Sequence, residues 1–284
     1  MLEGPDTVVR AITDDGAFRV ITARTTATVR HALKVQRGTG ATARDFGDLL
    51  TGTILVRETM APQLRVQGIL RDGEGGRLLA DSHPTGRTRG LIQLPQNKGE
   101  MARGPSATLQ MMRSLPSGRI NQGIVQLPSA GAISEALMAY MQTSEQVVSM
   151  LAVGTLLEDD DVQCAGGYIV QLLPEAGRGP LMLMTERLKD FETFDDKLSV
   201  DEFSPEWLLQ ELLYGIPFTR LDESSVRFEC WCNELRLVEA LATLKRSDIE
   251  ELLRDGNVLE ITCDYCGREY AIPPARLQGL LDES

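Results

Sequence analysis

The chain has 284 residues, of which 42% are hydrophobic, so it is long and apolar enough for one large packed domain and one small one. No apolar run approaches the roughly 20 residues of a membrane-spanning helix, and the first residues lack the pattern of a secretory signal, which predicts a cytoplasmic protein with no membrane partner. The net charge is −12, and the whole excess of acidic side chains lies in the last third of the chain, because residues 1–185 hold 18 acidic and 18 basic side chains. This acidity disfavours binding to nucleic acid.

The first part of the chain combines helical and strand patterns. Helical periodicity covers residues 29–37, 45–60 and 132–142. Short apolar and alternating segments predict strands at residues 64–70, 76–81, 89–94, 107–112, 123–127, 147–153 and 168–173. Glycine-bearing turns such as Asp72-Gly73 separate consecutive strands and favour antiparallel hairpins. We therefore expect an α+β fold, with a sandwich-like core domain over residues 1–178.

An acidic, aromatic-rich segment over residues 179–226 follows this domain. Residues 186–223 hold 11 acidic against 4 basic side chains and six of the 14 aromatic residues. Disordered linkers are poor in aromatic residues, so this segment is expected to fold against another surface. Ser204 as N-cap, Pro205 at the first position and Gly215 as the stop predict a helix within it.

Two interpretations of this linker remain open. It is an ordinary amphipathic connector, or it is held marginally and can detach, because its charge favours expansion while its apolar side chains favour docking. In the second case the residues that fasten it are Trp207, Leu208, Leu212 and Phe218.

Four of the five cysteines form two close pairs, Cys230-Trp-Cys232 and Cys263-Asp-Tyr-Cys266, with 30 residues between the pairs. Cytosolic proteins rarely keep structural disulfides, so these thiols are candidate metal ligands or redox-active groups. Two pairs that a folded insert brings together supply the four corners of a tetrahedral zinc site. Gly267 follows the second pair and suits a sharp turn around a metal. We predict one zinc ion per chain, bound by Cys230, Cys232, Cys263 and Cys266.

The residues around these pairs predict a small helix-and-hairpin module over residues 227–284. Leucines at helical spacing indicate a helix over residues 234–244, and Ser247-Asp-Ile-Glu250 has the pattern of a capping box that opens a second helix. Residues 259–263 alternate as a strand, and residues 270–272 can return beside it. Such a module has little core of its own, so metal ligation should supply most of its stability.

Spacing alone leaves two uses of this site open. It is a structural zinc ribbon that only holds its shape, or it is a redox sensor. The second use has chemical support, because oxidation to a disulfide removes two thiolate ligands at once and releases the metal.

At these residues the sequence resembles the 33 kDa chaperonin family, the redox-regulated heat-shock holdases of bacteria. The segments that carry the resemblance are Phe228-Glu-Cys230-Trp-Cys232, Ala240-Leu-Ala-Thr-Leu244, Asp248-Ile-Glu-Glu251 and Cys263-Asp-Tyr-Cys266-Gly-Arg-Glu-Tyr270. Upstream, residues 140–146, residues 165–174 and the pair Arg89-Gly90 look like core-domain segments of that family.

The resemblance implies a chaperone that is inactive when its four cysteines are reduced and bind zinc. In the oxidised state Cys230 pairs with Cys232 and Cys263 with Cys266, zinc leaves, and the small domain and linker unfold. The core domain then binds unfolded or oxidatively damaged client proteins and protects them from aggregation, with a homodimer as the expected active form.

The sequence also departs from the family pattern. Trp231 and Asn233 stand where the family usually has a small polar residue, which is expected to change the rate of oxidation. Cys164 has no counterpart in that pattern, and its simplest role is that of a buried small residue beside a strand.

Two other functions compete with the redox-switched chaperone. One is a zinc-ribbon adaptor that binds a macromolecule through the core domain. The other is a thiol-disulfide oxidoreductase that uses Cys263 and Cys266. This function is disfavoured, because the pair is not predicted to lie between a strand and a helix, where the pKa of a thiol would be lowered. The sequence shows no combination of nucleophile, base and orienting group, so we do not expect an enzyme.

Overall fold

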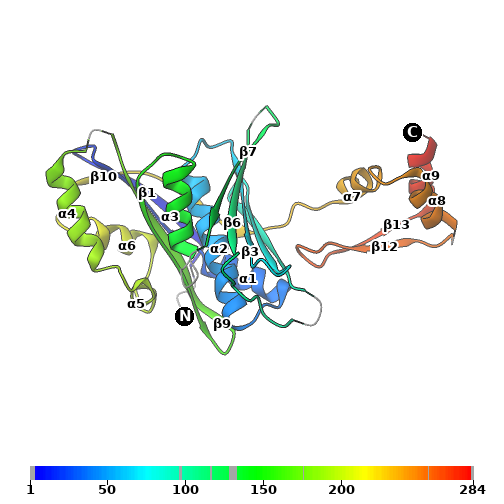
Figure 1. Ribbon diagram of the computed structural model, residues 1–284, viewed down its shortest axis with the longest axis horizontal. Helices are drawn as coiled ribbons and strands as arrows, with labels where there is room; N and C mark the ends of the chain where they lie inside the picture. The colour runs from blue at the N-terminus through cyan, green and yellow to red at the C-terminus, as the bar shows by residue number, and fades with distance from the viewer. Residues whose placement is uncertain are drawn as a thin grey trace. The chain divides into compact units, whose positions relative to one another are not determined.

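The computed structural model describes residues 4–95, 98–115, 117–127, 133–174, 176–254 and 256–282. The chain divides into two compact units, Met1–Glu229 and Cys230–Ser284. The first unit contains two β-sheets and most of the helices (Figure 1). The α+β class predicted from the sequence is confirmed. Within the described ranges, none of the helices is both long and apolar enough to cross a lipid bilayer.

The first sheet has five strands in the order β10-β1-β2-β9-β8, and all neighbours in it are antiparallel. Its strands are β1 (Thr7–Thr13), β2 (Phe18–Arg24), β8 (Ser149–Glu158), β9 (Asp161–Leu172) and β10 (Phe218–Ser225).

The second sheet has six strands in the order β11-β5-β4-β3-β6-β7. Its strands are β3 (Arg65–Arg71), β4 (Arg77–Ser82), β5 (Arg87–Gln93), β6 (Thr108–Ser114), β7 (Ile120–Gln126) and β11 (Arg227–Phe228). The predicted hairpins β3-β4 and β4-β5 are confirmed as antiparallel pairs, whereas β11 pairs with β5 in parallel.

Helix α2 (Gly40–Glu58) lies between the two sheets and contacts strands of both. Phe46, Leu50 and Ile54 are fully buried in the main core of the unit. Gly90 on β5 lets this helix approach closely, because a Cβ atom there would lie 2.6 Å from the Phe46 ring. Helices α1 (Thr26–Gln36) and α3 (Ile133–Thr143) complete this layer, and Ala132, the predicted start of α3, lies outside the described residues.

The predicted linker folds onto the outer face of the first sheet. It forms α4 (Arg178–Lys189), α5 (Phe194–Leu198), α6 (Pro205–Leu212) and then strand β10. The N-cap prediction for α6 is confirmed, since the Ser204 Oγ accepts a hydrogen bond from the Trp207 N–H at 3.1 Å. Successive side chains of each strand point to opposite faces of this sheet. Val8 and Ile21 point to the main core with α2, whereas Val20 points to the other face and belongs to a second apolar cluster, the linker cluster, which the linker helices complete.

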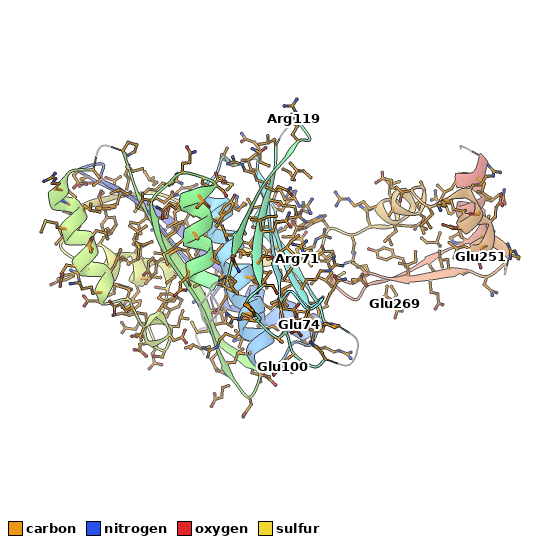
Figure 2. The ribbon with its side chains drawn as sticks, viewed as in Figure 1. Arg71, Glu74, Glu100, Arg119, Glu251 and Glu269 are labelled. Atoms are coloured by element: carbon orange, nitrogen blue, oxygen red, sulfur yellow. The ribbon has the colours of Figure 1, made fainter. Side chains whose placement is uncertain are left out.

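The C-terminal unit is a two-stranded sheet with three helices. Its elements are α7 (Glu234–Leu241), α8 (Arg246–Arg254), β12 (Leu259–Thr262), β13 (Glu269–Ile272) and α9 (Pro274–Asp282). Its core is small, and its buried members are Ile249, Ile272, Leu277 and Leu281. Charged side chains such as Glu251 and Glu269 point away from this core (Figure 2).

Several sequence predictions were wrong at element boundaries. The capping box at Ser247 is not formed, because α8 begins at Arg246 and the Ser247 hydroxyl donates to the Asp248 carboxylate instead. The sequence patterns also missed β1, β2, β10, β11, α4, α5 and α9.

Candidate metal and thiol site

The four C-terminal cysteines come together in the structure. Cys230 and Cys232 lie in the segment before α7, and Cys263 and Cys266 lie in the turn between β12 and β13. Their Sγ atoms all lie within 4.8 Å of one another. Cys263 is buried and the other three are half-buried, so the sulfurs are partly shielded from water.

The turn that carries the second pair is a tight knuckle. The Cys263 N–H donates to the Arg268 carbonyl at 2.9 Å, and the Cys263 carbonyl accepts from the N–H of Cys266 at 3.2 Å and of Gly267 at 2.7 Å. Gly267 has a φ of +70°, which a side chain would disfavour, as the sequence predicts for this position. The Cys263 and Cys266 sulfurs are thereby fixed on one side of the turn.

The first pair is positioned by the helix that follows it. Asn233 is the N-cap of α7, and its side-chain oxygen accepts a hydrogen bond from the Arg236 N–H at 2.9 Å. Trp231, between the two cysteines, is 8% exposed. The N-cap of α7 therefore directly follows Cys232.

The sulfur separations fit zinc. The Cys230 and Cys263 sulfurs are 3.8 Å apart, the Cys232 and Cys266 sulfurs are 3.4 Å apart, and none of the five cysteines, all of them among the described residues, forms a disulfide. A tetrahedral zinc ion with bonds of about 2.3 Å to sulfur places its ligands about 3.8 Å from one another. The donor set, four thiols with no oxygen ligand, is the one that structural zinc sites use.

The site favours deprotonation of one of its thiols. Burial raises the pKa of Cys232, but the hydrogen bond from the Tyr270 hydroxyl at 3.1 Å and those from the neighbouring thiols outweigh it and bring the pKa to about 7. Burial raises the pKa of Cys263 and of Cys266. Cys232 therefore ionises more readily than Cys263 or Cys266.

Cys164 lies elsewhere, on β9, where it is half-buried against the linker cluster. Burial raises the pKa of its thiol to about 11. Such a thiol is protonated at neutral pH and reacts slowly.

The predicted linker residues share one apolar cluster. Leu208 and Leu212 are fully buried in it, and Trp207 and Phe218 pack against it. The cluster also contains Tyr168 of β9, whose ring meets those of two linker phenylalanines edge to face at 5.7 and 5.4 Å. The linker residues are thus packed on the first sheet.

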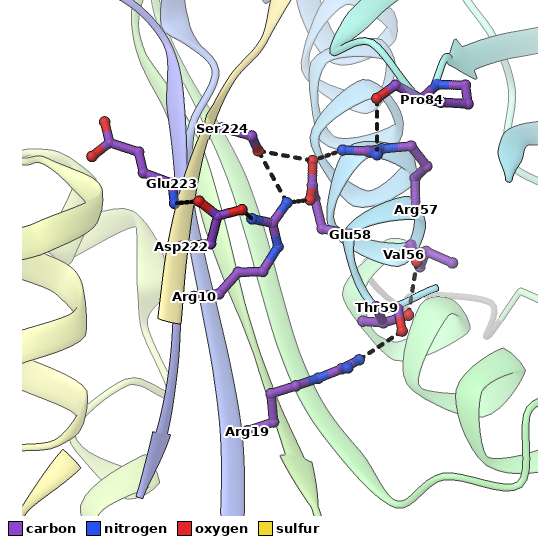
Figure 3. A network of polar contacts seen from close by, with 10 residues as sticks. All are labelled: Arg10, Arg19, Val56, Arg57, Glu58, Thr59, Pro84, Asp222, Glu223 and Ser224. Atoms are coloured by element: carbon purple, nitrogen blue, oxygen red, sulfur yellow. Dashed lines mark hydrogen bonds and ion pairs between the residues drawn. The ribbon is translucent and has the colours of Figure 1, made fainter. Parts of the chain in front are cut away.

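Sequence reasoning missed two features. One is the hydrogen bond from Tyr270 to Cys232. The other is a buried charge cluster in which the carboxylate of Glu58, 1% exposed, pairs with Arg10 and Arg57 (Figure 3). No local pattern signals the contacts of Tyr270 with Cys232 or of Arg10 with Glu58, because these partners are distant along the chain.

Comparison with known proteins bears on this fold and site. A family model described as Hsp33 protein matches residues 6–273. The chain is 30% identical over 288 residues to the 33 kDa chaperonin of Desulforamulus reducens, and the match covers 97% of each chain. It is 30% identical to the 33 kDa chaperonin of Shouchella clausii, with 98% of each chain covered. The crystal structure of the 33 kDa chaperonin from Thermotoga maritima has the same fold, with a TM-score of 0.83, 24% identity and 99% coverage of both chains.

The fold and site define an α+β protein of two units in which the smaller unit carries a four-thiol cluster. The chain belongs to the Hsp33 family, so the resemblance found from the cysteine-bearing segments is confirmed. Membership supports a chaperone function, and a chaperone binds unfolded polypeptides.

Proposed function

We propose that this chain is a redox-regulated holdase, inactive while Cys230, Cys232, Cys263 and Cys266 are reduced and bind one zinc ion. The observation that carries the proposal is the approach of four thiols, none of them in a disulfide, to within 4.8 Å of one another in a unit with a small apolar core. A unit of this kind depends on its metal for stability. Its folding therefore responds to the oxidation state of the thiols.

Oxidation of the thiols is the proposed trigger. In each pair, Cys230 with Cys232 and Cys263 with Cys266, two thiolates lose two electrons and form one disulfide. One hydrogen peroxide per pair accepts these electrons, takes two protons from the solvent and is reduced to two water molecules. Four thiolate ligands are lost in this way, and the C-terminal unit loses the metal that stabilises it.

The linker is the proposed second part of the switch. Strand β11, which pairs with β5, ends two residues before Cys230. We propose that unfolding of the C-terminal unit pulls on this short strand and so loosens the end of the linker. Release of α4–α6 uncovers the outer face of the first sheet, which carries Val9, Val20, Tyr168 and Val170. We propose that unfolded or oxidatively damaged proteins bind to this face. The active form is a homodimer in the cytoplasm, and it binds these proteins without catalytic turnover.

A combined measurement tests this function. Zinc content and suppression of aggregation of a chemically unfolded protein are measured with and without peroxide. We expect one zinc per chain and no suppression in the reduced state, and loss of zinc with strong suppression after oxidation. A zinc-ribbon adaptor would show no gain in suppression, and an oxidoreductase would turn over a disulfide substrate.

Cysteine variants test the ligand assignment. Cys263→Ser should lower zinc binding severely, because it removes one of four ligands, whereas Cys164→Ser should leave the zinc content unchanged. Loss of metal in the Cys164 variant would contradict the assignment.

A further inference from the structure

Strand β10 occupies the edge of the first sheet next to β1. The two strands are antiparallel and paired from Thr7 opposite Ser225 to Thr13 opposite Phe218, with a bulge between Arg10 and Ala11. On its other side β1 is paired with β2. Because β10 belongs to the linker that we propose to detach, its release would leave β1 as a free strand edge.

Apart from Phe218, which packs against the apolar cluster at the start of the strand, the side chains of β10 contribute little to holding it in place. Residues 219–223 are exposed, and Leu221 in the middle of the strand is 54% exposed. An exposed strand of this kind is held mainly by its main-chain hydrogen bonds, which any polypeptide can make. Pairing with the β1 edge therefore depends only weakly on the side chains of the strand that occupies it.

A few polar contacts supplement the main chain near the centre of β10 (Figure 3). Arg10 pairs with Asp222 at 3.5 Å and donates to the Ser224 hydroxyl at 3.1 Å, and that hydroxyl donates to Glu58 at 3.2 Å. If β10 leaves, Arg10 stays paired with the buried carboxylate of Glu58. It then offers a fixed positive charge to an acidic or hydroxyl side chain on an incoming strand.

The edge itself is built to persist without β10. Val8 is fully buried in the main core under α2, and β2 supplies main-chain partners along the other side of β1. A strand fixed in this way presents unpaired N–H and C=O groups in a regular row, which is a template for another strand.

We propose that the β1 edge, once vacated by β10, binds an extended segment of an unfolded polypeptide as a new antiparallel strand. This inference rests on the proposed function, since it requires the linker to detach. Main-chain pairing explains binding that does not depend on sequence, and the adjacent apolar face holds the alternate side chains that point toward it. In the zinc-bound state β10 acts as the chain's own occupant of the edge.

Amide hydrogen exchange in the full-length protein tests the inference. The probe is a small protein whose cysteines have been reduced and carboxymethylated so that it cannot refold. Oxidation should remove protection from those Thr7–Thr13 amides that face β10 and leave the amides that face β2 protected. Addition of the unfolded probe should restore protection to the first set, while the amides of residues 218–225 continue to exchange.

The outcomes separate the two proposals. If the oxidised protein binds the probe and the β10-facing amides of β1 still exchange freely, edge pairing is wrong while the holdase function stands. If β10 stays protected after oxidation while the probe binds, edge pairing is wrong and the holdase function stands. If the oxidised protein does not bind the probe, the proposed function fails and the edge proposal falls with it. If the amides of residues 218–225 regain protection together with those of β1, the chain's own strand has returned and edge pairing is also wrong.

A variant of the occupant provides a second test. Glu223→Thr with Ser225→Thr raises the strand propensity of β10 at two exposed positions, so β10 should compete better for the edge and weaken probe binding about five-fold after oxidation. A matched change on α4, Glu186→Thr, should leave probe binding unchanged. Equal binding by the β10 variant and the unaltered chain would contradict competition for the edge.

Discussion

Tyr270 connects the second strand of the small hairpin to the thiol cluster through its 3.1 Å hydrogen bond to Cys232. Hydrogen-bond partners outside the metal ligands tune ligand basicity and orientation, and their loss lowers metal affinity about 10–100-fold. We expect Tyr270→Phe to weaken zinc binding by at least about ten-fold, measured by competition with a chromogenic chelator. Tyr214→Phe, at an exposed position in the linker, is the control. Equal zinc affinity in both variants would show that the bond does not support the site.

The buried carboxylate of Glu58 gives a second prediction at this scale. It pairs with Arg10 and with Arg57, which is 5% exposed, so its removal leaves the buried Arg57 cation without this counter-charge and leaves Arg10 with only the exposed Asp222. Breaking one side of a buried ion pair costs about 3–5 kcal/mol. Glu58→Gln should therefore lower the free energy of unfolding of the first unit by about 3 kcal/mol in urea.

The control for this variant is an exposed ion pair. Glu186→Gln removes the partner of Lys189 on the surface of α4 and should change stability by less than about 1 kcal/mol. Similar effects of the two substitutions would indicate that the Glu58 cluster is solvated in solution.

The residues of the thiol site were predictable to different degrees. The spacing of the two cysteine pairs was sufficient to predict one cluster, because thiols at such intervals have few other uses in a reducing compartment. The role of Tyr270 was not predictable, since it depends on the register that places Tyr270 opposite Ile261 in the hairpin. Register is set by pairing across the turn, which the sequence of one strand does not specify.

At the scale of elements, helix α6 fastens the linker to the first sheet. Leu212 is fully buried there, and the Trp207 ring packs beside Phe203 at 6.3 Å between centroids. Leu212→Glu places a charge without a counter-charge in this cluster and should cost several kcal/mol of docking energy. Trp207→Ala removes part of the packing and should act in the same direction.

We expect both variants to suppress client aggregation with zinc bound and all cysteines reduced. Hydrogen exchange of residues 205–212 and the zinc content are measured in the same samples. Leu183→Glu, at a position on α4 that is 52% exposed, should leave the chaperone inactive under reducing conditions. If the α6 variants lose linker protection and still fail to suppress aggregation, linker release does not expose the client surface.

Helices and strands could be predicted only where the local sequence carries a cap, a turn residue or a periodic apolar pattern. Helix α6 was predictable because its N-cap, Pro205 and its leucine face agree with one another. Strand β10 was not, because its residues are mostly polar and exposed and show no alternation. It forms a strand because β1 offers it an edge, and a tertiary contact of this kind has no local signature.

At the scale of the whole molecule, the two units differ in what stabilises them. The first unit surrounds α2 with a large apolar core, whereas the buried core of the second consists of four side chains. Structural zinc contributes about 10–16 kcal/mol in comparable small modules, whereas each buried apolar side chain contributes only about 1.5–3 kcal/mol. Stability in the second unit should therefore be lost with the metal, and stability in the first should not.

We accordingly expect a chelator, added in reducing buffer, to unfold the chain after about residue 225 and to leave residues 1–178 folded. Amide hydrogen exchange should show loss of protection in β12, β13 and the helices of the second unit, with the amides of α2 and β9 unchanged. Readdition of zinc should restore protection, because the thiols stay reduced and no covalent change has occurred. Protection that remains uniform after the metal is removed would mean that the small core suffices to hold the second unit. In that case thiol oxidation would need another route to release the linker.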